Sequence, residues 1–283
     1  MSTLIQKRSF ANTLRMDNWW IEPALVMFGF LSFIVYSTWA AFQNDYFFWS
    51  GAATSGFGGY LSPMYSPILF IKEGITNGAT VEQLREHAWL GAWPEWWPAF
   101  LPASPAFLIL PFPGLFRFTC YYYRKAYYRA FAGSPPACAV GAVPQSPYKG
   151  ETEMLTFQNL HRYALYFAII FIFILSYDAV LSFFRGGEFG IGVGSIVLLI
   201  NPILLGAYTF GCHSFRHLIG GKLDCYSCGM SEKTRYKGWL KVSWLNNRHM
   251  LFAWCSLIWV GFTDVYVRMV SMGVWHDFST WNM

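Results

Sequence analysis

Five long apolar runs divide the chain, and polar, glycine-rich or proline-rich segments separate them. Each run is close to the roughly 20 apolar residues that an α-helix needs to cross a membrane. We therefore predict one all-α membrane domain over residues 1–283, built as a bundle of about five transmembrane helices. The predicted spans cover residues 19–42, 96–118, 161–184, 191–217 and 247–270.

The segments between the runs complete this picture. A polar arm of residues 1–18 precedes the first run, and an aromatic and glycine-rich stretch follows it over residues 43–95. Because so long a stretch is rarely structureless in a compact protein, we expect an extracytoplasmic loop region that caps the membrane surface. Prolines break the second run, and Pro202 predicts a kink in the fourth; membrane bundles tolerate such prolines.

Composition supports the membrane assignment and excludes other classes. Of the 283 residues, 55% are hydrophobic and only 12% are charged. Soluble domains have about 25% charged residues. The basic residues are not grouped with exposed aromatics, which argues against nucleic-acid binding. Neither a cleavable signal peptide nor a dinucleotide-binding fingerprint is evident, so nucleotide-cofactor chemistry is not expected on this chain.

The distribution of Lys and Arg predicts the orientation of the bundle. With the N-terminus in the cytoplasm, all but four of the 20 basic residues lie on the cytoplasmic side or at its interface. This bias is what the positive-inside rule requires, so we predict a cytoplasmic N-terminus. The same orientation brings six potential ligands to the cytoplasmic face: His161, His213, His217, Cys225, Cys228 and His249.

One short segment combines several metal-ligating side chains. His213 and His217 are four residues apart, so on a helix they share one face. Gly220 and Gly221 follow and can end that helix, because glycine readily adopts the left-handed conformation. The chain could then double back and bring Cys225 and Cys228 towards the two imidazoles. Two thiolates with two imidazoles are the ligand set of zinc sites and of Rieske-type [2Fe–2S] centres.

Three chemistries compete for this cluster. A structural zinc would be held tetrahedrally by four ligands. A b-type haem would need imidazoles from two helices, such as His161 or His249 with a histidine of the fourth run. A Rieske-type centre would take two cysteines on one iron and two histidines on the other. Taken singly, His161 and His249 could equally be histidines that only hydrogen-bond a carbonyl at a helix end.

Two stretches carry a family resemblance, residues 120–128 (CYYYRKAYY) and residues 211–217 (GCHSFRH). With shorter stretches they resemble the membrane-anchor subunit of a bacterial succinate dehydrogenase, over most of the chain. The similarity is greatest to the five-span branch that carries a membrane-embedded Rieske-type cluster in place of haem. The shorter stretches are residues 18–20, 36–41, 65–67, 104–107 and 135–138.

The resemblance implies the rest of an electron-transfer complex in the bacterial cytoplasmic membrane. An iron–sulfur subunit would dock at the cytoplasmic face and carry a flavoprotein subunit that oxidises succinate, and a further small membrane subunit could share the bilayer with lipid. Electrons would pass through a Rieske-type [2Fe–2S] cluster in this chain to a membrane quinone. Cys212 could replace one thiolate, and His249 is a reserve ligand. The expected cluster ligands are His213, His217, Cys225 and Cys228.

Two other functions remain open. The first is the haem b-containing anchor of a related fumarate reductase, and the second is a non-redox membrane scaffold with a structural zinc. On either redox reading, the succinate-binding and flavin chemistry belongs to another chain, since no dinucleotide fingerprint is found here.

A quinone site is expected near the same corner, because a quinone needs an apolar slot and polar groups at its carbonyl oxygens. Asp178 and Asp264 fall towards the opposite face, where buried carboxylates suggest a second quinone site or a proton path. The candidate quinone-binding residues at the cytoplasmic interface are Tyr121, Tyr122, His161, Arg162 and Arg216.

Overall fold

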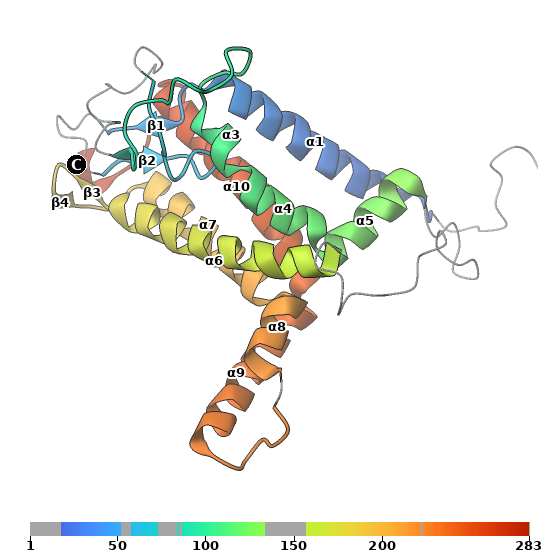
Figure 1. Ribbon diagram of the computed structural model, residues 1–283. Helices are drawn as coiled ribbons and strands as arrows, with labels where there is room; N and C mark the ends of the chain where they lie inside the picture. The colour runs from blue at the N-terminus through green and yellow to red at the C-terminus, as the bar shows by residue number, and fades with distance from the viewer. Residues whose placement is uncertain are drawn as a thin grey trace, which may run out of the picture.

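Four long apolar helices form the body of the protein (Figure 1). The computed structural model describes residues 18–51, 58–72, 84, 87–133, 157–221 and 223–282. Most of the predicted polar arm, and residues 135–138, lie outside these ranges. By length and composition, each of the four helices could cross a membrane. They are α1 (Ile21–Gln43), α6 (Phe157–Leu181), α7 (Val193–Phe210) and α10 (His249–Ser271).

The predicted second span differs from the structure. Residues 94–104 form turns and extended chain, and two short helices follow, α3 (Pro105–Ile109) and α4 (Pro111–Thr119). A proline stands at the start of each helix, where a backbone N–H would have no partner within the helix. Inside one continuous helix the same prolines would each remove a backbone hydrogen bond, so the helix is interrupted there. The α3–α4 pair therefore occupies the place of the span predicted over residues 96–118, and α4 packs along α6.

The predicted fourth span also ends early. Helix α7 stops at Phe210, with Pro202 inside it, and a second helix, α8 (His213–Gly220), begins after two intervening residues. Gly211 ends α7, and a Cβ at this position would clash with the Ala207 carbonyl oxygen and lie tightly against the backbone of Leu245 in α9. The Cys212 sulfur then caps α8 by accepting a hydrogen bond from the N–H of Phe215, 3.2 Å away. Glycine at the junction and the Cys212 cap thus accompany the break between the two helices.

Helix α8 pairs with α9 (Met230–Asn247) to form a hairpin that projects from the bundle (Figure 1). Helix α5 (Tyr121–Ala132) lies at the same end and packs on the start of α1. We call this the hairpin end; it corresponds to the predicted cytoplasmic face. The opposite end carries two strand pairs, β1 (Phe48–Trp49) with β2 (Tyr60–Leu61) and β3 (Phe184–Arg185) with β4 (Glu188–Phe189), and is called the strand end.

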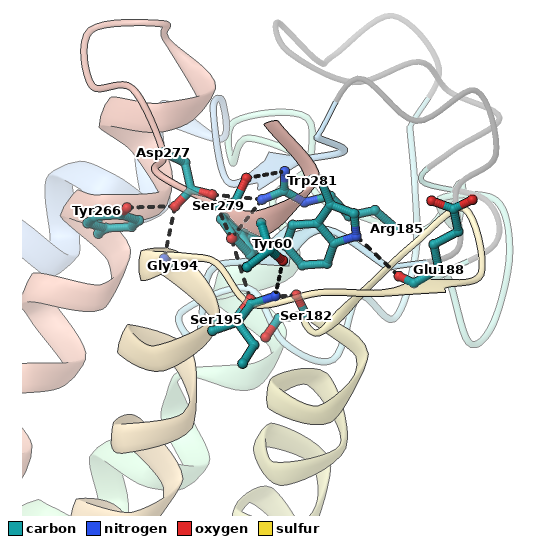
Figure 2. Close-up of polar contacts among 12 residues, drawn as sticks. Tyr60, Ser182, Arg185, Glu188, Gly194, Ser195, Tyr266, Asp277, Ser279 and Trp281 are labelled. Atoms are coloured by element: carbon teal, nitrogen blue, oxygen red, sulfur yellow. Dashed lines mark hydrogen bonds and ion pairs between the residues drawn. The ribbon is translucent and has the colours of Figure 1, made fainter. Parts of the chain in front are cut away.

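A buried ion pair closes the strand end (Figure 2). The Asp277 carboxylate accepts from the Arg185 guanidinium at 2.7 Å, from the hydroxyls of Tyr60 and Tyr266 at 2.8 Å, and from the backbone N–H of Gly194 at 3.0 Å. Burial, together with the neighbouring carboxylate, raises the pKa of Tyr60 to about 12, so the phenol stays a neutral donor. This network joins three regions that are distant in sequence: β2, the β3–α7 segment and the end of the chain from α10 onwards.

Both carboxylates singled out in the sequence lie in polar contacts towards the strand end. Asp264 accepts from Arg268 at 2.7 Å and from the Tyr36 hydroxyl at 2.5 Å, and Ser62 donates to it as well. Asp178 accepts from Ser66. These contacts tie α1, α6 and α10 to the loop after β2, so each carboxylate has a structural partner.

Candidate functional site

The predicted ligand cluster is only partly assembled. His213 and His217 lie one turn apart on α8 with ring centroids 4.7 Å apart, as expected. Cys225 and Cys228 are instead bonded to each other in a disulfide, so neither presents a thiolate. The loop that carries them forms the far part of the α8–α9 hairpin (Figure 1). Among the described residues, no three His, Cys, Asp or Glu side chains converge on one metal ion.

A second set of two cysteines and two histidines lies inside the hairpin end. Each member stands where a helix begins or ends: between α4 and α5, in the first turns of α6, between α7 and α8, and at the first residue of α10. Three of them are buried and the fourth is partly buried. The four are Cys120, His161, Cys212 and His249, and below we call them the inner set.

Direct contacts link the inner set. The Sγ of Cys120 lies 3.5 Å from Nε2 of His249. The ring of Tyr208 stacks on His249 with centroids 4.9 Å apart, and it meets Phe116 edge-on at 5.6 Å. Phe116 in turn stacks on His161 at 4.5 Å. The two histidines therefore flank a buried aromatic pair, and Cys120 joins them from the end of α4.

Hydrogen bonding determines which nitrogen of His161 is available. Its Nδ1 lies 3.1 Å from the carbonyl oxygen of Phe116 and 3.1 Å from the hydroxyl oxygen of Thr119. A carbonyl can only accept, so Nδ1 carries the hydrogen and Nε2 keeps the lone pair. Metal-bound histidines commonly have this arrangement, with the distal nitrogen donating to a carbonyl. In His249, Nδ1 is buried and has no hydrogen-bond partner among the described residues.

Cys212 is buried beside these residues. Burial raises the pKa of its thiol to about 12, although the N–H of Phe215 donates to the sulfur and favours the thiolate. Cys120 nearby raises the pKa further, because two thiolates repel each other. A thiol with so high a pKa is a poor nucleophile at neutral pH, so Cys212 is suited to a structural role or to binding a metal that displaces its proton.

The predicted quinone-binding residues have separate surroundings. Tyr121 is 71% exposed, whereas the Tyr122 hydroxyl accepts from the Trp254 indole at 2.8 Å, and burial raises its pKa. Arg162 is exposed. Arg216 donates to Ser243 at 3.0 Å and lies over the Trp239 ring. His161 belongs to the inner set. None of these five residues lines the larger described cavity, which lies deeper in the bundle.

A cavity of about 190 Å³ lies inside the bundle instead, between α1, α4, α6, α7 and α10. Its walls are mostly apolar, and Arg117 and Tyr208 are among the side chains that line it. Tyr208 also stacks on His249, so one wall of the cavity is in contact with the inner set.

Sequence reasoning missed Cys120 and Arg117. Cys120 is remote in sequence from the other potential ligands, so the spacing of Cys and His residues does not single it out. It nevertheless ends an apolar run at the predicted cytoplasmic face, as Cys212 does. Arg117 is a lone charge inside the run FPGLFRFT, and an ionisable residue in such a run is itself a functional signal.

Comparison with known proteins gives a consistent assignment. The family described as actinobacterial succinate dehydrogenase subunit SdhC matches residues 21–273. A chain of the Mycobacterium smegmatis Sdh1 complex in the apo form is 39% identical; the match covers 96% of each chain and has a TM-score of 0.75. No curated protein matches. The resemblance to a succinate dehydrogenase membrane anchor is thereby confirmed, and the chain belongs to the actinobacterial SdhC family.

Proposed function

We propose that this chain anchors a succinate-oxidising assembly to the bacterial cytoplasmic membrane and passes its electrons to a membrane quinone. Family membership and the four apolar helices support the anchor role. An iron–sulfur subunit carrying a flavoprotein subunit would dock at the hairpin end, where the basic α8–α9 hairpin projects. A further small membrane subunit could pack on the apolar side chains that α1 exposes, such as Phe28 and Val35.

We further propose that the inner set holds a Rieske-type [2Fe–2S] cluster. Cys120 and Cys212 would bind one iron, and His161 and His249 the other. When bound, such a cluster accepts and releases one electron at a time, at a potential of roughly −150 to +300 mV. Two irons need two ligand pairs rather than four ligands around a single ion.

The observation that carries this proposal is the position of the unpartnered ligand atoms. The Cys120 sulfur and the His249 imidazole are in contact, and the second nitrogen of His249 is buried without a partner. The Phe116 carbonyl orients His161 so that Nε2 is its free nitrogen. Burial keeps water from these atoms, and their location at the hairpin end places them next to the face where an electron donor would dock.

The ligand set expected from the sequence has less support. Cys225 and Cys228 would have to be reduced, and their loop would have to fold back onto α8. His213 is exposed at the surface of α8, and its pKa is lowered by desolvation and by the neighbouring His217, Arg216 and Arg162. These basic neighbours suit a docking surface for an acidic partner.

A haem b anchor is the alternative cofactor reading. His161 and His249 lie on different helices at the same end of the bundle, as two axial ligands would. Phe116 and Tyr208 lie between their rings, so a porphyrin would have to displace both aromatic side chains, and a cluster bound by both histidines likewise requires these two rings to move.

The test is spectroscopy on the purified complex. We expect the reduced wild-type complex to show the EPR signal of a Rieske centre, with its low average g value, and no haem bands. Cys120→Ser and His161→Ala should each abolish that signal and quinone reduction, while succinate still reduces a soluble dye. The matched controls, Cys255→Ser and His217→Ala, should keep the signal. If His217→Ala loses the EPR signal and Cys120→Ser keeps it, the cluster ligands are those expected from the sequence. Haem bands in the wild-type complex would refute the cluster.

A further inference from the structure

The loop that joins α8 to α9 carries the disulfide between Cys225 and Cys228 (Figure 1). Two residues separate the cysteines, so they form a Cys-x-x-Cys motif. Cys228 is exposed and Cys225 is half-buried. Because the loop lies on the projecting hairpin, a second protein can reach Cys228 from solvent without any movement of the helix bundle.

The compartment gives this disulfide its meaning. The inference rests on the proposed function for one point, the orientation in which the hairpin end faces the cytoplasm. Glutathione and thioredoxin keep most thiols there reduced, and the disulfides that do form are usually transient and catalytic or redox-sensing. An accessible Cys-x-x-Cys disulfide on that face is therefore expected to open and close rather than to serve as a permanent link.

Ring contacts connect the motif to the body of the hairpin. Tyr226 stands between the two cysteines, and its ring centroid lies 4.8 Å from that of Tyr236 on α9. Tyr236 stacks on Trp239 with centroids 6.0 Å apart. The guanidinium carbon of Arg216 on α8 lies 4.6 Å from the centroid of the Trp239 ring. The conformation of the loop is thus linked to the packing of α8 against α9.

The half of the hairpin next to the loop has little else to hold it. Of α9, which is described in full, Val242 alone is buried, and it lies in the half remote from the loop. Arg235 donates to the carbonyls of Ile219 at 3.2 Å and of Gly221 at 2.6 Å. Segments with few buried contacts open locally at a small cost in free energy, so a covalent constraint in the loop has a large share in keeping this half closed.

We propose that Cys225 and Cys228 form a reversible thiol–disulfide site, which a cytoplasmic dithiol protein reduces and which controls how tightly the loop half of the hairpin is held. A thiolate of the dithiol protein attacks the exposed Cys228 sulfur, the S–S bond breaks, and Cys225 leaves as a thiolate that takes a proton from water. The second thiol of the dithiol protein then attacks the mixed disulfide, which releases Cys228. Two electrons and two protons pass to the pair, and the dithiol becomes a disulfide.

The first test counts thiols in the assembled wild-type complex in lipid nanodiscs. The complex is incubated with thioredoxin, thioredoxin reductase and NADPH, labelled with a maleimide mass tag and digested with trypsin. We expect each cysteine of the peptide of residues 223–233 to gain a tag, while labelling of the free Cys255 stays the same. A pair that resists reduction until the complex is denatured would overturn the proposal, as would a pair that holds zinc in the complex as isolated.

A trapping experiment tests the attack on Cys228. A thioredoxin variant that lacks its second active-site cysteine should remain joined to Cys228 by a mixed disulfide, which peptide mapping locates. Cys228→Ser leaves no disulfide to attack and should give no adduct. The matched control, Cys255→Ser, should give the same adduct as the wild type. An adduct confined to Cys255 would overturn the proposal.

Hydrogen exchange measures the effect on the hairpin. Reduction should raise the exchange rate of the backbone amides of residues 230–239 about tenfold, because the loop half then opens more often. Amides of α6 serve as the internal reference and should not change. The double variant Cys225→Ser/Cys228→Ser should exchange like the reduced wild type whether or not reductant is present. Equal rates in the oxidised and reduced wild type would refute control of the hairpin by the pair.

Vesicle orientation separates this inference from the proposed function. Thioredoxin added to sealed inverted membrane vesicles reaches the cytoplasmic face and should reduce the pair. Reduction only in vesicles of the opposite orientation would refute the cytoplasmic reductant together with the proposed orientation. A complex that exchanges as expected but lacks the Rieske signal and quinone reduction would refute the proposed function alone.

Discussion

The sulfur of Cys120 lies 3.5 Å from Nε2 of His249, although 129 residues separate them in the chain. The contact joins the junction of α4 and α5 to the first residue of α10. A thiol and an imidazole at this distance can form a hydrogen bond without a metal. The other two members of the inner set are also potential metal ligands, which favours a metal site. His161 and Cys212 reach the same buried region from two further helices.

Removing the disulfide distinguishes the inner set from the ligand set that was expected from the sequence. We expect the double variant Cys225→Ser/Cys228→Ser to keep both its EPR signal and its quinone turnover, because these sulfurs lie on the hairpin and outside the inner set. The measurement is EPR of the reduced complex, with succinate–quinone activity measured in parallel. A lost signal in the double variant would return the cluster to the hairpin.

Asp277→Asn should destabilise the strand end. The change keeps the shape of the side chain but leaves the Arg185 charge buried without a counter-ion. Breaking a buried pair in this way costs about 3–5 kcal/mol. Thermal unfolding in detergent, followed by the fluorescence of the tryptophans, would show a clearly lowered midpoint.

The exposed ion pair of Arg129 with Glu22 provides the control. Its side chains are 45% and 74% exposed, and its N–O distance is 3.9 Å. Exposed pairs contribute about 0–1 kcal/mol, so Glu22→Gln should barely move the midpoint. Equal effects of the two substitutions would show that the Asp277 network does not hold the strand end.

Charge reversal on α9 should weaken docking of the iron–sulfur subunit. Lys233, Lys237 and Lys241 are exposed on the hairpin, so their replacement by Glu would repel an acidic partner surface without disturbing the hairpin. Arg235 is left unchanged, because it donates to the carbonyls of Ile219 and Gly221 and holds α8 against α9. Co-purification in mild detergent measures the effect. A triple variant that keeps its partner at high salt would place the docking surface elsewhere.

Orientation can be tested with reporter fusions. The excess of Lys and Arg at the hairpin end predicts that this end faces the cytoplasm. Fusions of a topology reporter at positions 150 and 230 should therefore both report a cytoplasmic location, and a fusion after residue 190 should report the opposite side. A periplasmic signal at position 150 or 230 would invert the orientation.

The sequence predicted four of the helices because long apolar runs are determined locally. It overestimated the second span, since hydropathy does not register that Pro105 and Pro111 each start a new helix. It also extended the fourth span across Gly211, where α7 ends and the chain packs tightly against Leu245 of α9, a residue distant in sequence. Local composition thus indicated where the membrane segments lie, and tertiary contacts determined where they end.

The site was harder to predict, for a related reason. Residues 212–228 attracted attention because their ligands are close in sequence, yet the hairpin carries Cys225 and Cys228 away from the bundle. The inner set is close only in space. It could have been found by asking which Cys and His residues end an apolar run on the cytoplasmic side, because helix ends on one face of a small bundle are neighbours.

The ion pair of Arg185 with Asp277 also has a consequence for biosynthesis. The two residues are 92 positions apart, so Arg185 is made well before its counter-ion. At about 5–20 residues per second, translation needs roughly 5 to 18 s to reach Asp277. During that interval Arg185 lacks its counter-ion, so the ion pair that closes the strand end cannot form. A ribosome that stalls between the two residues would leave an unsealed anchor, which the membrane's quality-control proteases could recognise by its open end.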